Sequence, residues 1–136
     1  MALFYLDASA LVKLVRAEPE TDALHAFLVD SDLLSSELAL TEVPRAIRRV
    51  AAHDSALAQQ LLCQARELLD AVALLPIDRA LLAAAGALEE PALRALDAIH
   101  LAAAIDVSPI DAFVSYDERQ SAAARLAGLR TVSPVR

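Results

Sequence analysis

The sequence predicts an α/β fold, a central parallel sheet of four to five strands flanked by helices. Short apolar runs alternate with longer segments whose apolar residues recur at helical spacing. Two of these runs, 3–6 and 112–114, are each followed within three residues by an aspartate and a helical segment. Ligands of parallel α/β sheets bind beyond the carboxyl ends of the strands. We therefore expect Asp7 and Asp117 at that edge of the sheet.

The first half of the chain is expected to form a strand, two helices, a strand and a helix, at 2–6, 9–16, 20–30, 33–35 and 37–52. Pro19 separates the first two helices, because proline interrupts helical hydrogen bonding. Leu24, Phe27 and Leu28 give the second helix an apolar face. Ser36 is the expected N-cap of the third helix.

The second half is expected to continue with helices and strands at 54–69, 72–75, 78–88, 94–105, 112–114, 118–126 and 129–132. Asp54 and Asp78 stand where two of these helices begin, a position that favours aspartate. Pro76 ends the third strand, and Gly128 is placed as the C′ residue of the last helix. No repeat or linker divides the chain, so residues 1–136 are expected to form one domain.

Composition limits the classes of protein that remain. A hydrophobic content of 57% with two glycines is typical of a compact helical domain and excludes a disordered chain. Cys63 is the single cysteine, which excludes an internal disulfide and fits a reducing, cytoplasmic setting. No basic N-terminal segment predicts a signal peptide, and no apolar run approaches the roughly 20 residues that span a bilayer.

The formal charge of −7 is unfavourable for binding bulk nucleic acid, whose affinity depends on neutralised phosphates. The basic residues are nevertheless almost all arginine, with Lys13 as the single lysine. Arginine binds phosphate through a bidentate fork. The charge balance therefore favours a selective substrate over general nucleic-acid binding.

Asp7 and Asp117 each have a structural and a functional interpretation. Both precede a helix, where an aspartate commonly serves as N-cap. For Asp7 we favour function, because Ser9 competes for the capping role and would leave the carboxylate free. For Asp117 the two interpretations are balanced. If the strands before them are neighbours, the two carboxylates face each other across the crevice.

Glu42 and Asp97 are candidates from helices. Glu42 lies at the margin of an apolar helix face, and its alternative role is a solvated pair with Arg45 or Arg49, worth a few tenths of a kcal/mol. Pro44 would kink this helix and aim Glu42 inward. One interpretation of Asp97 is that its negative charge is stabilised by the positive end of the helix dipole. The other is that, in apolar surroundings, its carboxylate needs a partner such as a metal ion.

Together these acids predict an all-oxygen site for a hard cation such as Mg²⁺ or Mn²⁺, and hence metal-assisted cleavage of phosphodiesters. Ser9 and Ser115 are expected to support it by hydrogen bonds to carboxylates or water. Arg119 either reaches a phosphate or forms a surface ion pair. His100, one turn after Asp97, is interpreted as a packed or supporting residue and not as a ligand.

The chain resembles the PIN-domain ribonucleases, specifically the VapC toxins of bacterial type II toxin–antitoxin systems. The resemblance covers essentially the whole sequence. Its motifs are Leu6-Asp7-Ala8-Ser9-Ala10, Ser36-Glu37-Leu38 with Thr41-Glu42-Val43-Pro44-Arg45-Ala46, Leu96-Asp97-Ala98-Ile99-His100-Leu101-Ala102 and Ser115-Tyr116-Asp117-Glu118-Arg119. Each motif is a weak pattern alone, but their order and spacing in a chain of this size indicate the family.

This resemblance implies a PIN fold with an acidic Mg²⁺ pocket and endonuclease activity on RNA. Asp7, Glu42, Asp97 and Asp117 would be the metal-site carboxylates, with Ser9 and Ser115 in support. It also implies a homodimer and a VapB-type antitoxin whose C-terminal segment covers the site, with the apolar face of 20–30 as part of the antitoxin groove. Because no nucleophilic side chain is evident, water is expected to attack phosphorus directly.

Other classes fit less well. A phospho-receiver domain needs a lysine after a late strand, and Lys13 lies too early in the chain. A haloacid-type phosphatase needs a second aspartate two residues after Asp7, where Ser9 stands. A non-catalytic PIN-like interaction module is one remaining alternative, although the intact set of acids argues against it. A DNA-directed nuclease is the other, because nothing in the sequence reads a 2′-hydroxyl.

Overall fold

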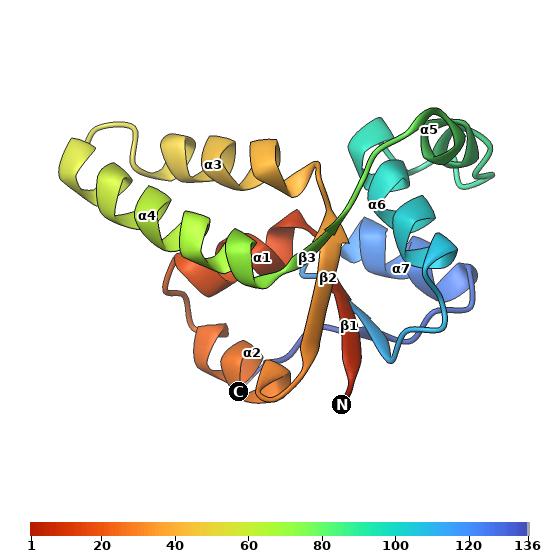
Figure 1. The fold of residues 1–136 in the computed structure, drawn as a ribbon, viewed down its shortest axis with the longest axis horizontal. Helices are drawn as coiled ribbons and strands as arrows, with labels where there is room; N and C mark the ends of the chain where they lie inside the picture. Colours follow the sequence, from red (N-terminus) through yellow and green to blue (C-terminus); the bar gives the residue numbers. More distant parts are fainter. Residues whose placement is uncertain (136) are drawn as a thin grey trace.

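The computed structural model describes residues 1–135 and contains the strands and helices that the sequence predicts (Figure 1). In chain order they are β1 (Leu3–Leu6), α1 (Ala8–Val15), α2 (Thr21–Leu28), β2 (Asp32–Ser36), α3 (Ala39–Val50), α4 (Ser55–Ala71), β3 (Ala73–Leu75), α5 (Arg79–Gly86), α6 (Ala95–Asp106), β4 (Ala112–Val114), α7 (Glu118–Leu126) and β5 (Thr131–Val132). Across this described part, none of the helices is long and apolar enough to cross a membrane.

The strands form one parallel sheet in the order β3-β2-β1-β4-β5, which confirms the predicted fold class. The central strand β1 lies between β2 and β4, with Tyr5 in register with Leu34 and Phe113. Because neighbouring parallel strands end at the same edge, the residues that follow β1 and β4 come close together. This topology brings Asp7 and Asp117 to one side of the sheet.

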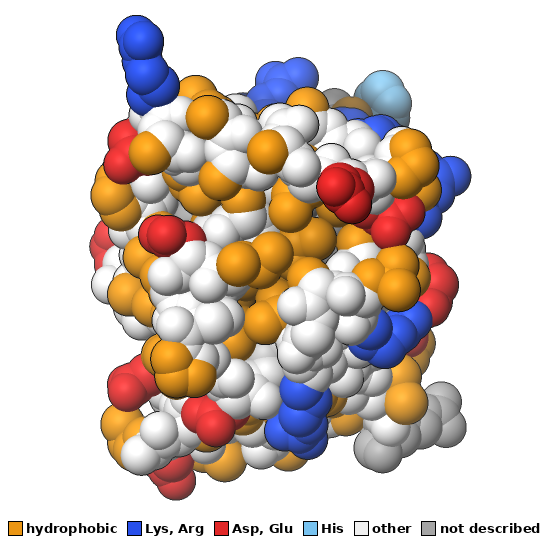
Figure 2. Space-filling view, turned by 90° about the vertical axis from the view of Figure 1, so that its right-hand side faces the viewer, with side chains coloured by type: hydrophobic (Ala, Val, Ile, Leu, Met, Phe, Trp, Pro, Cys, Tyr) orange, Lys and Arg blue, Asp and Glu red, His pale blue; other side chains and the backbone are white. Residues whose placement is uncertain are grey.

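Alternate side chains of the sheet enter two separate apolar clusters. Phe4 and Leu6 belong to one cluster, with α1 to α4, whereas Tyr5 and Phe113 belong to the other, with α5 to α7. Such alternation with a period of two is what a strand covered on both faces requires. Figure 1 shows the two groups of helices on opposite sides of the sheet. The outer surface of the α5–α7 side carries apolar side chains around a central hollow (Figure 2).

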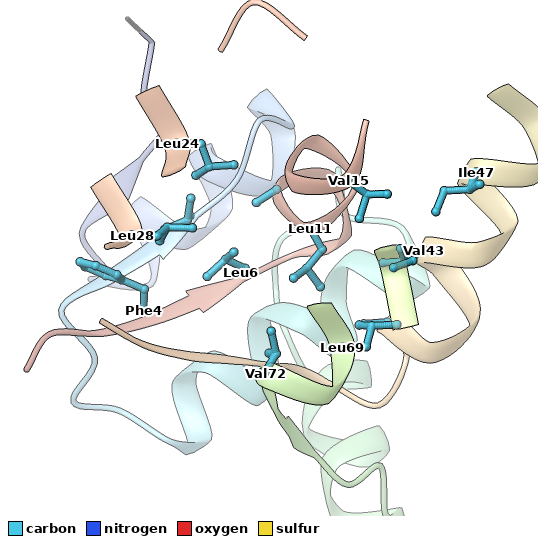
Figure 3. Close-up of a cluster of buried hydrophobic side chains, with 14 of the residues drawn as sticks. Phe4, Leu6, Leu11, Val15, Leu24, Leu28, Val43, Ile47, Leu69 and Val72 are labelled. Atoms are coloured by element: carbon cyan, nitrogen blue, oxygen red, sulfur yellow. The ribbon is translucent and has the colours of Figure 1, made fainter. Parts of the chain in front are cut away.

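The first cluster anchors two of the helices that carry site residues, α1 and α3. Figure 3 shows Leu11, Leu24 and Val43, from three different helices, packed with Leu6 of β1. All four side chains are buried. A fully buried leucine is stabilised by about 1.5–3 kcal/mol relative to an exposed one. This packing fixes α1 and α3 beside the carboxyl end of β1.

Two expected helix starts were wrong. Asp7, and not Ser9, is the N-cap of α1, because its Oδ1 accepts the backbone N–H of Ala10 at 3.1 Å. The third helix begins at Ala39 instead of 37. The backbone N–H of Glu37 still donates to the Leu75 carbonyl at 3.0 Å, so the chain continues along β3 before it turns into the helix. The expected N-cap was also wrong: Leu38 holds that position, and Ser36 Oγ accepts the N–H of Leu38 in the turn before the helix.

The apolar face of α2 is not available to a partner, so its expected place in an antitoxin groove was wrong. Leu24 is 0% exposed and Leu28 7% exposed, both within the first cluster. Phe27 stacks on Phe4 with 4.7 Å between ring centroids. The predicted apolar face of α2 is confirmed, but it packs against the protein's own core.

Candidate active site

The structure brings the four predicted carboxylates together in one cavity of about 520 Å³. Asp7, Glu42, Asp97 and Asp117 all line it. Asp7 and Asp117 follow β1 and β4, whereas Glu42 and Asp97 lie in the first turns of α3 and α6. Residues separated by up to 110 positions in the chain therefore meet at the carboxyl edge of the sheet.

Asp7 is the most deeply buried of the four, with 5% of its surface exposed. Ser115 Oγ donates a hydrogen bond to its Oδ2 at 2.5 Å, and Ser9 Oγ donates to its Oδ1 at 2.6 Å. Burial raises the pKa of Asp7, and these hydroxyl bonds with the Ala10 N–H offset only part of that rise. Ser9 and Ser115 thus lie where the sequence predicted them to support a carboxylate.

Asp117 is both the N-cap of α7 and part of the cavity. Its Oδ1 accepts the backbone N–H of Gln120 at 3.1 Å. Its own N–H donates to Ser115 Oγ at 3.0 Å, so the hydroxyl that contacts Asp7 also holds the backbone at Asp117. The capping and cavity-lining roles of this aspartate are therefore compatible.

Asp97 lies close to the other negative charges of the cavity. Burial raises its pKa first, and the negative charges of Asp117 and Glu42 add to the rise. Arg94, 3.8 Å away from Nε to Asp97 Oδ2, opposes it. A cation bound in the cavity would therefore reduce the repulsion of Asp97 by Asp117 and Glu42.

Glu42 pairs with His100, and not with Arg45 or Arg49 of α3. Glu42 Oε1 lies 2.6 Å from His100 Nε2. The ring's other nitrogen, Nδ1, is 2.8 Å from the hydroxyl of Tyr5. His100 therefore contacts a candidate ligand, in keeping with the supporting role expected for it.

Sequence reasoning missed Gln120, a fully buried residue that joins two of the acidic segments. Its Nε2 donates to the carbonyl oxygen of Asp97 at 3.1 Å, while its backbone N–H binds Asp117. Aspartate followed three residues later by glutamine is a sequence signal for a helix start, but it does not predict the contact of Gln120 with Asp97, because in a capping box this side chain would bond the N-cap N–H. Arg49 and Arg94 also line the cavity and were not assigned to it. Arg119 is exposed on α7 and is not brought to the cavity.

The donor set fits a hard divalent cation, which prefers carboxylate oxygen and water. Among residues 1–135, no three His, Cys, Asp or Glu side chains are already gathered as ligands of one ion. Asp7 and Glu42 are instead held by Ser9, Ser115 and His100. Mg²⁺ commonly takes one or two carboxylates directly and retains several waters. The spacing of these acids around one cavity is compatible with that mode.

Comparison with known proteins places the chain in a class. The sequence pattern of the PIN domain matches residues 4–126, and the chain belongs to this family. Its similarity to curated relatives places it among the VapC ribonucleases of that family. It is 41% identical to "Ribonuclease VapC35" of Mycobacterium tuberculosis over 97% of both chains. It is 39% identical to "Ribonuclease VapC46" of the same species, over 98% of this chain and 99% of the relative.

Solved structures agree with the fold. VapC20 of Mycobacterium tuberculosis, described as a toxin that cleaves the sarcin–ricin loop, superposes with a TM-score of 0.71 at 19% identity. The match covers 96% of this chain and 99% of VapC20. PAE2754 from Pyrobaculum aerophilum gives a TM-score of 0.62 at 21% identity, over 96% of this chain and 84% of its own.

Proposed function

We propose that this protein is a metal-dependent endoribonuclease that acts as the toxin of a VapBC-type toxin–antitoxin pair in the cytoplasm. Asp7, Glu42, Asp97 and Asp117 are the proposed ligands of Mg²⁺ or Mn²⁺. The observation that carries the proposal is the convergence of these four carboxylates in one cavity. The names of the similar curated proteins, the ribonucleases VapC35, VapC47 and VapC46, favour RNA over DNA as the substrate.

The protein's own residues bind and orient the reacting groups. Ser9 and Ser115 hold both oxygens of Asp7 before substrate arrives, so little reorganisation is needed. Asp117 and Asp97 complete the acidic wall on the α6–α7 side. When bound, the divalent ion supplies Lewis-acid stabilisation of charge on the phosphoryl and leaving oxygens and lowers the pKa of water. Attack of water on phosphorus then leaves a 5′-phosphate and a 3′-hydroxyl.

A second groove, of about 580 Å³, supports a path for the RNA strand. It shares Ser9, Glu42 and Arg49 with the acidic cavity, so the two are continuous. Arg45, one helical turn before Arg49, also lines it. Both guanidinium groups lie on the same face of α3. They supply local positive charge for phosphates beside the cut, in a chain whose overall charge is −7.

The partners belong to the same proposal. A VapB-type antitoxin would inhibit the enzyme by covering the acidic cavity with its C-terminal segment. For a homodimer, the α5–α7 side offers apolar surface (Figure 2). A groove of about 370 Å³ there is lined by Leu81, Leu88 and Ile105, with Leu82 exposed nearby. Apolar surface of this kind is typical of interfaces between subunits.

Mapping the 5′ ends of cellular RNA after induction tests the proposed activity. Wild-type protein is expected to create new 5′-phosphorylated ends at defined positions, and Asp97→Asn is expected to create none. Purified protein should reproduce these cuts with Mg²⁺ and lose them in EDTA. Identical ends from Asp97→Asn, or cuts that persist in EDTA, would contradict the proposal. Cleavage of DNA alone would favour the DNA-directed alternative.

A further inference from the structure

A buried chain of hydrogen bonds runs from the centre of the sheet to the acidic cavity. Tyr5, in β1, is 0% exposed, and His100, in α6, is 1% exposed. The Tyr5 hydroxyl is 2.8 Å from His100 Nδ1, and His100 Nε2 is 2.6 Å from Glu42 Oε1. Three elements that are distant in sequence, β1, α6 and α3, are thereby joined through polar atoms.

The surroundings of His100 hold its ring in one orientation. Tyr5 packs against the imidazole edge-on, with 5.9 Å between ring centroids, and stacks on Phe113 at 5.4 Å. The neighbouring residues of α6, from Leu101 to Ala104, are buried in the same apolar cluster. An imidazole that lost its partners here would be costly, because buried polar groups need hydrogen bonds. The packing therefore aims Nε2 at Glu42.

The donor and the acceptor in each of these hydrogen bonds follow from the chemistry of the three side chains. An ionised carboxylate only accepts hydrogen bonds, so His100 Nε2 carries the hydrogen that reaches Glu42. In the neutral ring Nδ1 then accepts, and the Tyr5 hydroxyl donates to it. Glu42 Oε1 is occupied by this contact. The second oxygen of Glu42, Oε2, is left for the cavity that the residue lines.

We propose that His100, fixed by Tyr5, is a positioning residue that orients Glu42 and thereby sets the affinity of the cavity for a divalent ion. This inference rests on the proposed function, since it concerns the same carboxylates. His100 is not a ligand here, because both ring nitrogens are already occupied by Tyr5 and Glu42. Removal of a residue that hydrogen-bonds a metal ligand commonly lowers metal affinity or activity about 10–100-fold.

Calorimetric titration of Mn²⁺ into the full chain tests the role. His100→Ala is expected to weaken Mn²⁺ binding about 10–100-fold. Tyr5→Phe, which keeps the ring packing and removes only the hydroxyl, should weaken it less. His100→Gln should recover part of the affinity, because its amide N–H can replace the Nε2 donor. The electron paramagnetic resonance spectrum of bound Mn²⁺ should change in His100→Ala and return toward the wild-type spectrum in His100→Gln.

A matched control separates positioning from general stability. Leu101 is the next residue of α6, is 2% exposed and packs in the same apolar cluster. Leu101→Ala should lower the melting temperature without changing the Kd for Mn²⁺. An unchanged Kd in His100→Ala, or an equal loss of affinity in Leu101→Ala, would overturn the inference. If His100→Ala does not fold, Tyr5→Phe carries the test, and an unchanged Kd for Mn²⁺ in Tyr5→Phe overturns the inference.

Asp7→Asn distinguishes this inference from the proposed function. If Asp7→Asn loses Mn²⁺ while His100→Ala binds it like the wild-type protein, the positioning role fails and the metal site stands. If Asp7→Asn also binds Mn²⁺ with wild-type affinity, the proposed metal site itself fails.

Discussion

Asp7→Asn is expected to reduce the turnover of RNA cleavage by about 10²–10³-fold, the loss typical when one preorganised electrostatic contact is removed from an active site. Asp7 is the carboxylate held most firmly, with Ser9 and Ser115 on its two oxygens. Asparagine keeps the shape and the cap of α1 but loses the negative charge. The measurement is kcat with a labelled RNA under saturating Mg²⁺.

The same substitution should leave the fold intact, so that loss of activity reports on chemistry. Burial raises the folded-state pKa of Asp7 above its unfolded value of 3.8. A carboxyl group whose pKa is higher in the folded state than in the unfolded state favours folding while it is protonated. Its contribution to the free energy of unfolding is lost as the pH rises through the folded-state pKa. In EDTA at neutral pH, Asp7→Asn lacks this penalty and is expected to be at least as stable as the wild-type protein.

Asp54→Asn provides the matched control. Asp54 is the N-cap of α4, as Asp7 is of α1, and its Oδ1 accepts the N–H of Leu57 at 3.0 Å. It does not line the acidic cavity. Turnover in Asp54→Asn should equal that of the wild-type protein. Full turnover in Asp7→Asn would refute the assignment of Asp7.

Divalent ions are expected to stabilise the fold by about 2.7 kcal/mol when their concentration is a hundredfold above Kd. The reason is the repulsion within the cavity. Burial raises the pKa of Asp97, and the charges of Asp117 and Glu42 add to the rise, so the acids of the metal-free site repel one another. A bound cation offsets that repulsion in the folded state only. The melting temperature should rise by roughly 10 °C for a domain of this size.

Thermal melts in EDTA and in millimolar Mn²⁺ measure this effect. Asp7→Asn and Asp97→Asn should each show a smaller rise with Mn²⁺, because each variant has lost one candidate ligand. Asp54→Asn should show the full rise. A wild-type melt that does not respond to millimolar Mn²⁺ would count against a metal site in this cavity.

The sequence was most informative where local pattern and topology agree. Apolar runs that end near Asp7 and Asp117 predicted strands of a parallel sheet, and the pairing of β1 with β4 confirmed that these are neighbours. The prediction that Ser9 would cap α1 and leave Asp7 free was wrong. One carboxylate oxygen accepts the N–H of Ala10 while the residue still lines the cavity.

Contacts between distant helices could not be predicted in this way. Glu42 and His100 are 58 positions apart, and their contact depends on how α3 and α6 sit across the sheet. Local spacing favoured an Arg45 or Arg49 partner for Glu42 instead. The prediction that the apolar face of α2 contacts an antitoxin was wrong for a similar reason. Amphipathicity indicates that a helix face is buried, but it does not identify the residues that cover it.

The most direct test of the central claim is anomalous diffraction from a crystal soaked in Mn²⁺. We predict an anomalous difference peak inside the cavity bounded by Asp7, Glu42, Asp97 and Asp117, within direct or water-mediated reach of their oxygens. The peak should be weaker in an Asp7→Asn crystal soaked in the same way. A wild-type crystal with Mn²⁺ bound only elsewhere, or with no peak at all, would contradict the account.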